Sequence, residues 1–303
     1  MDFRQLTYFV TAVEEGSISA AARKLFLSQP PVTAQIKALE EELGCALLVR
    51  GARSVRMTEE GRLLYDRAKA MLALRDGAEE EILSRVHSGG GTLRLGVVSS
   101  VAGSLLPEWL AAFHEERPLI RFALSEENTY HLLDGLRNGL SEAALVRTPF
   151  AAEGLETLPL LREELVAAGR RELLPEGEDV RLAELARRPL LLYRRWEHIA
   201  LRLFAERGLS PQILLKGDGA DTIAALAARG LGIGLLPQSA VRALSGADFA
   251  VRRIEGGAIR TTVTAVRLAR AEPSPAAQAF WEFLARRAEP DAQESAPAGK
   301  DRA

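Results

Sequence analysis

Apolar residues near the N-terminus recur with the period of an α-helix in three short stretches. Residues 3–14 place apolar side chains every three or four positions, on one helical face. Gly16 interrupts this pattern, and Ser17 can cap a second short helix. Ser28 can then cap a third helix, which begins with two prolines suited to a first turn and ends at Gly44. The pattern predicts one helix followed by a helix-turn-helix.

The next stretch has a strand pattern and then a long helical one. Residues 46–57 hold short alternating apolar stretches around Gly51, which predicts a two-stranded wing. Thr58 then opens a helix expected over 59–86, whose apolar stripe needs a covering surface. We expect this helix to pair with its copy in a homodimer. Packing on the chain's own C-terminal half is the alternative, although the connector at 88–91 is short for it.

Residues 88–91, Ser-Gly-Gly-Gly, indicate a linker between domains. Beyond it, helical runs at 105–116 and 129–138 alternate with strand-like ones, which predicts parallel sheets with crossover helices in two lobes. The strand-like runs lie at 93–98, 122–124, 143–146, 165–168, 190–193, 213–216, 233–236 and 263–266.

The expected fold class is therefore an all-α winged helix-turn-helix followed by a long linker helix and a two-lobed α/β domain. We place these parts at 1–58, 59–88 and 89–288. Within the α/β domain, one lobe is expected from 92–161 with 267–288 and the other from 162–266. Residues 289–303 are polar and aperiodic, which predicts a disordered tail.

Composition excludes several classes of protein. The chain has 303 residues, 47% of them hydrophobic, but no uninterrupted apolar run of about 18 residues that could span a membrane. The N-terminus lacks the basic and then apolar pattern of a secretion signal, so we expect a cytoplasmic protein. The single cysteine, Cys45, cannot form an internal disulfide, and we interpret it as a small core residue rather than a sensing thiol.

Charge is informative only locally. The formal net charge is −2, and residues 1–88 hold 12 basic and 13 acidic residues, so bulk electrostatics does not favour binding to nucleic acid. Residues 43–58, however, carry Arg50, Arg53 and Arg56 and no acidic residue. Positive charge is thus concentrated where a phosphate contact could use it.

The third predicted helix carries polar side chains in its first turns. In a DNA-binding helix-turn-helix, the second helix of the motif enters the major groove with its N-terminal residues facing the bases. Gln29, Thr33 and Gln35 would be exposed there, and Gln can bond an adenine edge while Thr can serve a phosphate or a thymine methyl. Pro30 and Pro31 would add flat apolar surface. From spacing alone, a three-helix bundle without a DNA-binding role remains open.

The N-terminal residues resemble the LysR-type transcriptional regulators. The stretch is MDFRQLTYFVTAVEEGSISAAARKLFLSQPPVTAQIKALEEELGCALLVRGARSVRMTEEG. The residues at the family's positions and spacings are Ala20-Ala21, Leu25, Ser28-Gln29-Pro30, Val32, Gln35-Ile36, Leu39-Glu40, Leu43-Gly44, Leu47, Arg50, Arg53, Thr58 and Gly61. Pro31 and Thr33 stand where Ala and Ser are more usual. Leu48-Val49 stands where an aromatic residue followed by an acidic one is more usual. These differences affect base preference. The similarity thins after the linker and resumes weakly at 93–96, 105–107 and 228–237.

The resemblance implies a regulator that binds double-stranded DNA and a small-molecule effector. It implies a homodimer through the linker helix, usually a homotetramer on DNA, contact with RNA polymerase, no cofactor, and an effector domain similar to periplasmic solute-binding proteins. Base edges or the sugar-phosphate backbone would then be met by Gln29, Pro30 and Thr33, and phosphates or the minor groove by Arg4, Arg50 and Arg53. We include Ser28, Pro31 and Gln35 in the same DNA-contacting set.

An effector site is expected where strands end and helices begin, in the cleft between the lobes. The candidates from the first lobe are Ser99, Ser100, Thr129 and Arg147, and those from the second are Tyr193, Arg194 and Asp218. Ser99 and Thr129 could instead be helix caps, and the two arginines could be surface ion pairs. If both arginines face the cleft, a small carboxylate, which could be aromatic, is favoured.

An enzyme on the same α/β sheets, such as a hydrolase, is the main alternative, and a free-standing solute-binding protein is another. The four histidines are scattered and show no metal-site spacing. No G-x-S-x-G elbow occurs, and Gly230, Gly232 and Gly234 lack the final spacing of a dinucleotide loop. The missing signal peptide and the helix-turn-helix oppose a solute receptor. The sequence thus favours a regulator, and we expect no catalytic residues and no metal.

Overall fold

The computed structural model describes residues 1–50, 54–86, 90–242, 244, 248–255 and 259–289. The chain forms two compact units, the first mainly from residues 1–88 and the second mainly from residue 89 onward. No helix in these described ranges has the length and apolar composition needed to cross a membrane.

The first unit begins with the three predicted helices, which form a helical head around one apolar core. They are α1 (Phe3–Glu14), α2 (Ile18–Lys24) and α3 (Gln29–Leu43). Asp2 and Gln5 cap α1 reciprocally, and the Ser17 side chain accepts from Ala20 N at the start of α2. Buried side chains of all three helices, including Phe9, Ile36 and Leu39, share this core. Cys45 is half-buried and packs against it.

A short wing follows the head and is tied to it by hydrogen bonds from backbone N–H groups. Strands β1 (Leu48–Arg50) and β2 (Val55–Met57) pair antiparallel, as the alternating pattern predicts. Val55 N donates to Gly16 O at 2.9 Å, and Leu47 N donates to the Glu40 carboxylate at 2.9 Å. The predicted wing centre at Gly51 lies outside the described residues.

The long helix α4 (Glu59–Val86) completes the first unit. Thr58 opens it as expected, because its Oγ1 accepts from Gly61 N at 2.9 Å. One side of the helix packs on the head, where Ala68 is buried and Leu64 and Leu72 are partly buried. Other members of the predicted apolar stripe are exposed, namely Leu63, Met71, Leu74 and Ile82. Packing on the head therefore covers only part of the stripe.

The second unit consists of two lobes joined by a long strand, β6 (Leu155–Arg170). In the first lobe the sheet order is β4 (Ile120–Glu126), β3 (Gly91–Val97), β5 (Ala143–Arg147), β12 (Arg260–Leu268) and the first part of β6. In the second lobe the end of β6 pairs with β10 (Ile233–Pro237), followed by β8 (Pro189–Tyr193) and β9 (Gln212–Gly217). Strands β11 (Phe249–Ile254) and β7 (Asp179–Val180) extend from β6 on its other edge.

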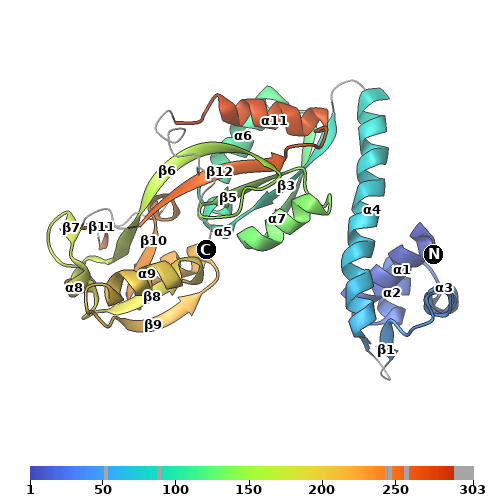
Figure 1. Ribbon diagram of the computed structural model, residues 1–303, viewed down its shortest axis with the longest axis horizontal. Coiled ribbons are helices and arrows are strands. Elements are labelled where there is room, and N and C mark those ends of the chain that lie inside the picture. The colour runs from blue at the N-terminus through green and yellow to red at the C-terminus, as the bar shows by residue number, and fades with distance from the viewer. Residues whose placement is uncertain (51–53, 87–89, 243, 245–247, 256–258, 290–303) are drawn as a thin grey trace. The chain divides into compact units, whose positions relative to one another are not determined.

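Helices cover the sheet of each lobe (Figure 1). The first lobe carries α5 (Ser99–Ala102), α6 (Leu106–Glu116), α7 (Thr129–Arg137) and α11 (Pro275–Ala285). The second carries α8 (Leu182–Leu185), α9 (Glu197–Ala205), α10 (Ala220–Ala228) and the short 3₁₀ turns η1 (Arg171–Leu173), η2 (Arg194–Trp196) and η3 (Gln238–Val241). Each lobe has its own hydrophobic core.

All eight strand-like runs of the sequence form strands, although Val98 at the end of the first run is the N-cap of α5. The sheets are mixed rather than parallel. Strands β6 and β12 run antiparallel to their neighbours because they connect the lobes instead of returning through a crossover helix (Figure 1). The run at 263–266, expected in the second lobe, buries Val263, Ala265 and Val266 in the core of the first.

The expected disordered tail lies outside the described residues from residue 290. Its first residue, Glu289, belongs to the folded part, since its backbone N donates to Leu160 O at 2.9 Å.

Candidate functional site

The start of α3 is exposed on the surface of the helical head. Ser28, Gln29, Pro30 and Pro31 are all exposed, while Val32 in the same turn is fully buried. The buried stripe of α3 anchors the helix to the core, and the other residues of its first turn face outward. The structure therefore brings the predicted DNA-contacting residues of this turn together on one surface.

Ser28 occupies the N-cap position but makes no capping bond with its side chain, which corrects the sequence-based expectation. An N-cap hydroxyl normally accepts from the second or third amide of the helix. In α3 these positions are Pro30 and Pro31, which have no N–H. The Ser28 hydroxyl is consequently left facing solvent.

Two further residues of the set, Gln29 and Thr33, are tied to their surroundings. Ser19 Oγ on α2 donates to Gln29 Oε1 at 2.8 Å, and Thr33 Oγ1 donates to the Gln29 backbone carbonyl at 3.0 Å. Gln35 is half-buried on the next turn. Only Gln29 thus presents a carboxamide at the exposed tip.

The predicted phosphate-contacting arginines are only partly described. Arg4 on α1 and Arg56 on β2 are exposed. The side chain of Arg50 at the end of β1, and Arg53 as a whole, lie outside the described residues.

The second unit contains a cavity of about 650 Å³ between its lobes. It is lined by Val98, Ser99, Glu126, Glu127, Asn128, Thr129, Tyr130 and Pro149 from the first lobe, and by Tyr193, Arg194, Arg195, Trp196, His198, Ile199 and Asp218 from the second. The size is that of a small-molecule site. Five of the seven predicted effector residues line it, namely Ser99, Thr129, Tyr193, Arg194 and Asp218.

Neither Ser99 nor Thr129 acts as a helix cap. Val98 is the N-cap residue of α5, and Ser99 Oγ lies 3.2 Å from the Tyr193 hydroxyl across the cleft. At the start of α7 it is Asn128 Oδ1 that accepts from a backbone N–H. The Thr129 hydroxyl accepts instead from Arg195 Nη1 at 2.7 Å. Both hydroxyls therefore belong to the cavity wall.

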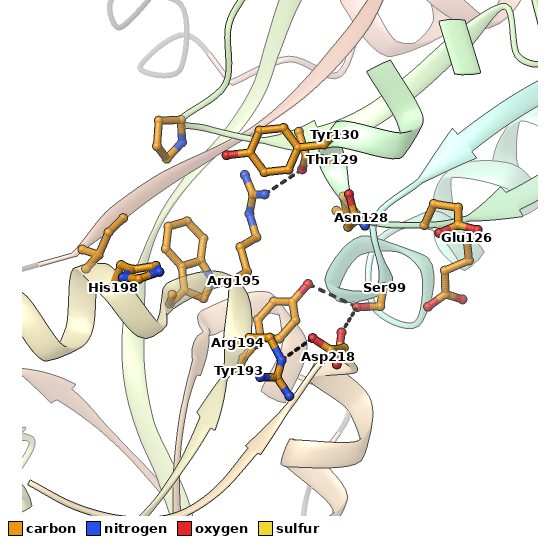
Figure 2. Close-up of a pocket in the computed structure, with 15 residues that line it drawn as sticks. Ser99, Glu126, Asn128, Thr129, Tyr130, Tyr193, Arg194, Arg195, His198 and Asp218 are labelled. Carbon is orange, nitrogen blue, oxygen red and sulfur yellow. Dashed lines mark hydrogen bonds and ion pairs between the residues drawn. The ribbon is translucent and has the colours of Figure 1, made fainter. Parts of the chain in front are cut away.

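Arg194 and Asp218 pair with each other at the cavity rim. Arg194 Nε donates to Asp218 Oδ1 at 2.7 Å, and both side chains are exposed (Figure 2). This is the surface ion pair that was the alternative interpretation of Arg194 from the sequence. A partly neutralised, solvated arginine of this kind is a weak anchor for a ligand.

Arg147 and Ser100 do not line the cavity, and Arg147 is neither a cleft residue nor a surface ion pair. Arg147 is fully buried and forms an ion pair with Glu163 of β6. Its Nε donates to Ser100 Oγ at 2.8 Å, and its Nη2 donates to Ser239 Oγ of η3 at 2.9 Å. Glu163 also accepts from Ser239 N at 2.6 Å. These four residues form a buried polar cluster that joins the first lobe, the connecting strand and the second lobe.

The arginine inside the cavity is Arg195, which was not among the residues predicted from the sequence. Figure 2 shows its guanidinium extending toward Thr129 and Tyr130. It donates to Thr129 Oγ1 and to the Arg147 carbonyl oxygen, and no carboxylate of the described chain lies within ion-pair distance of it. Burial lowers the pKa of Arg195, and the Arg147 charge adds to this effect.

Two donors in the cavity wall have no acceptor among the described residues. They are Arg195 Nε and the indole Nε1 of Trp196, and both atoms are buried. Buried donors without a partner are unfavourable until an acceptor reaches them. Among the described residues, no group of His, Cys, Asp and Glu side chains could hold a metal ion.

A helix-turn-helix head with a wing, followed by a two-lobed domain with a ligand-sized cavity, defines a ligand-responsive DNA-binding regulator. Comparison with protein families agrees with this class. Residues 3–62 match the model described as "Bacterial regulatory helix-turn-helix protein, lysR family", and residues 87–289 match "LysR substrate binding domain". The chain belongs to the LysR family of transcriptional regulators, which confirms the resemblance seen in its sequence.

Curated relatives and solved structures extend over nearly the whole chain. The nitrogen assimilation regulatory protein nac of Klebsiella aerogenes is 31% identical, with 94% of each chain covered. The transcriptional regulator BenM of Acinetobacter baylyi is 33% identical over 79% of this chain and 81% of its own. CbnR, a LysR family transcriptional regulator, has a TM-score of 0.79 at 27% identity, covering 95% of this chain and 100% of that one. The relatives are regulators, so the protein is not an enzyme.

Proposed function

We propose that this regulator reads its operator with the first turns of α3. Gln29, Pro30 and Thr33 would meet base edges, flanked by Ser28, Pro31 and Gln35, while Arg4, Arg50 and Arg53 would hold the phosphates. The exposure of residues 28–31 above a fully buried Val32 is the observation that carries this assignment. A solved structure of full-length CbnR with its target DNA, at a TM-score of 0.76, supports it.

A mobility-shift titration with the DNA upstream of the gene tests whether these residues contact the operator. Gln29→Ala should weaken binding to that DNA by about tenfold, since one bidentate base contact contributes roughly 1–3 kcal/mol. Arg4→Ala should weaken specific and nonspecific DNA alike and flatten the salt dependence. Salt-independent binding, or equal retardation of every sequence by the wild type, would contradict the assignment.

We propose a small carboxylate, with an aromatic or other planar body, as the effector. Its carboxylate would meet Arg195, the desolvated cation that has no carboxylate partner in the described chain, and its body would lie among Tyr130, Tyr193 and Trp196. Arg195 replaces Arg147 and Arg194 in this role, because the first is buried with Glu163 and the second is paired with Asp218.

Calorimetry against a panel of aromatic and aliphatic carboxylates tests the effector class. Arg195→Met should weaken carboxylate binding by about 10- to 100-fold, since a hydrogen bond to a charged group contributes roughly 1.5–3 kcal/mol. Arg194→Met is the matched control and should change it by less than about threefold, since its ion pair is exposed. Tighter binding of a cationic or sugar ligand than of any carboxylate would rule this class out.

We also propose that α4 forms a homodimer, which pairs further into a tetramer on DNA. Leu63, Met71, Leu74 and Ile82 are exposed and fall within about 100° of one another around the helix axis. An apolar face of this length is stabilised by a second copy. Leu63→Glu with Leu74→Glu should convert the dimer to a monomer in light scattering, whereas Arg62→Glu with Asp66→Lys, on exposed polar positions, should not.

The proposed signal is a change in the angle between the lobes when the effector occupies the cavity. Such a change would alter the spacing of the DNA-binding heads in the assembled oligomer. As a transcriptional regulator acting on DNA, the protein would work in the cytoplasm and contact RNA polymerase. Footprinting with and without the bound carboxylate tests this mechanism, since an unchanged footprint and bend would contradict it.

A further inference from the structure

The hydrogen bond from Ser19 to Gln29 links the two helices of the motif at their exposed surface. Ser19 lies in the first turn of α2, and its Oγ donates to Gln29 Oε1 at 2.8 Å. Both side chains are exposed, so water could satisfy each of them equally well. A bond of this kind adds little to folding stability. Its main consequence is the orientation of the Gln29 carboxamide.

The sequence of α3 makes this carboxamide unusually important. A helix normally offers four free backbone N–H groups at its N-terminus, and these can bind phosphates. Pro30 and Pro31 remove two of the four at the very turn that is exposed. Polar recognition at this tip therefore depends on side chains, and Gln29 is the one whose acceptor oxygen and donor nitrogen are separate groups held side by side, as a bidentate base contact requires.

We propose that Ser19 is a positioning residue that sets the base preference of Gln29. Its hydroxyl donates to one lone pair of Oε1, which turns the carboxamide oxygen toward Ser19 and the nitrogen away from it. The second lone pair of Oε1, which is an acceptor, and the Nε2 hydrogens, which are donors, then face outward side by side in a fixed arrangement. Adenine matches this arrangement, since its N6 donates and its N7 accepts, whereas guanine presents two acceptors. Ser19 thereby favours adenine over guanine at the base pair that Gln29 meets.

This inference rests on the proposed contact between Gln29 and a base edge, and it adds a second effect to it. A carboxamide that is already held loses less rotational freedom on binding DNA than one that turns freely. Removing the Ser19 hydroxyl should therefore weaken binding as well as discrimination. It should leave binding to nonspecific DNA unchanged, because that binding depends on phosphates.

The test uses a duplex that the wild-type protein selects from a randomised library, together with variants of that duplex changed at one base pair each. The proteins are the full-length wild type, Ser19→Ala, Ser19→Thr, Gln29→Ala and the double variant Ser19→Ala with Gln29→Ala. Ser19→Ala should weaken binding about three- to tenfold and reduce the adenine preference at the base pair where Gln29→Ala abolishes it. Ser19→Thr keeps the hydroxyl and should keep the preference. The double variant should equal Gln29→Ala.

The outcomes separate the inference from the proposed contact. If Gln29→Ala changes the preference at no base pair, or if no sequence is enriched, the proposed base contact is wrong. The proposed role of Ser19 is then wrong as well. If Gln29→Ala abolishes a preference that Ser19→Ala retains, only the positioning role is wrong. An additional loss from Ser19→Ala in the Gln29→Ala background would also overturn it. Far-UV circular dichroism and urea unfolding should be the same for Ser19→Ala and the wild type, because position 19 is exposed.

Discussion

Phe26, in the turn of the helix-turn-helix, occupies a backbone position that usually holds glycine. Its φ is +57° and its side chain is 96% exposed. Phe26 N donates to Arg23 O at 3.1 Å, and Leu27 N donates to Ala22 O at 2.8 Å. These two bonds are the Schellman motif that ends α2, in which the residue at this site adopts the left-handed conformation. The motif forces the conformation, and no packing of the ring offsets its strain.

Phe26→Gly should therefore stabilise the helical head. Left-handed backbone costs a residue with a β-carbon about 1–2 kcal/mol, so Phe26→Gly should exceed Phe26→Ala in stability by about 1 kcal/mol. The alanine variant is the matched control, since it removes the ring but keeps the β-carbon. Urea unfolding followed by circular dichroism measures the difference. The fluorescence of Trp109, Trp196 and Trp281 should not change, because all three lie in the second unit. Equal stability of the two variants would show that the turn is not strained.

At the scale of elements, the start of α4 is fitted closely against the wing. A β-carbon on Gly61 would lie 2.0 Å from Leu47 O and 3.2 Å from Thr58 Oγ1. Thr58 Oγ1 also donates to Ala46 O at 2.8 Å, which fixes the same junction from the other side. The helix cap, the wing backbone and the glycine thus form one joint between α4 and the head.

Gly61→Ala should break this joint. The added methyl meets backbone rather than a movable side-chain end, so we expect a loss of roughly 2–3 kcal/mol in the free energy of unfolding of the head. Glu60→Ala, one residue earlier and exposed, should stay within about 0.5 kcal/mol of the wild type. DNA binding should fall with the stability of the head. A Gly61→Ala protein that unfolds at the wild-type urea concentration would refute the close fit.

Elements with local signals could be predicted from the sequence, and contacts between distant residues could not. The caps at Ser17 and Thr58 and all eight strand-like runs follow from neighbouring residues. The choice between Arg194 and Arg195 depends on the turn η2, which directs one side chain to the rim and the next into the cavity. No spacing rule distinguishes adjacent arginines. Arg147 was misplaced because its partner Glu163 reaches it only through the long connecting strand β6.

At the scale of the ligand-binding unit, the buried cluster of Arg147, Glu163, Ser100 and Ser239 holds the two lobes together. Arg147 and Ser100 come from the first lobe, Ser239 comes from the second, and Glu163 lies on the strand that joins them. The guanidinium and the carboxylate are each almost completely buried, so each depends on the other for its solvation. Any change in the angle between the lobes must preserve or rearrange these bonds.

Removing one charge of this pair should therefore cost far more than removing both. Glu163→Leu leaves the Arg147 cation buried without its partner, and should lower the free energy of unfolding of the second unit by about 3–5 kcal/mol. Arg147→Met should do the same, whereas the double variant should recover much of the loss, because no unpaired charge remains. The exposed pair supplies the control: Arg194→Met with Asp218→Ala should cost at most about 1 kcal/mol. Urea unfolding followed by tryptophan fluorescence measures all of these. Single and double losses that simply add would mean that the buried charges are solvated independently, and the cluster would then not couple the lobes.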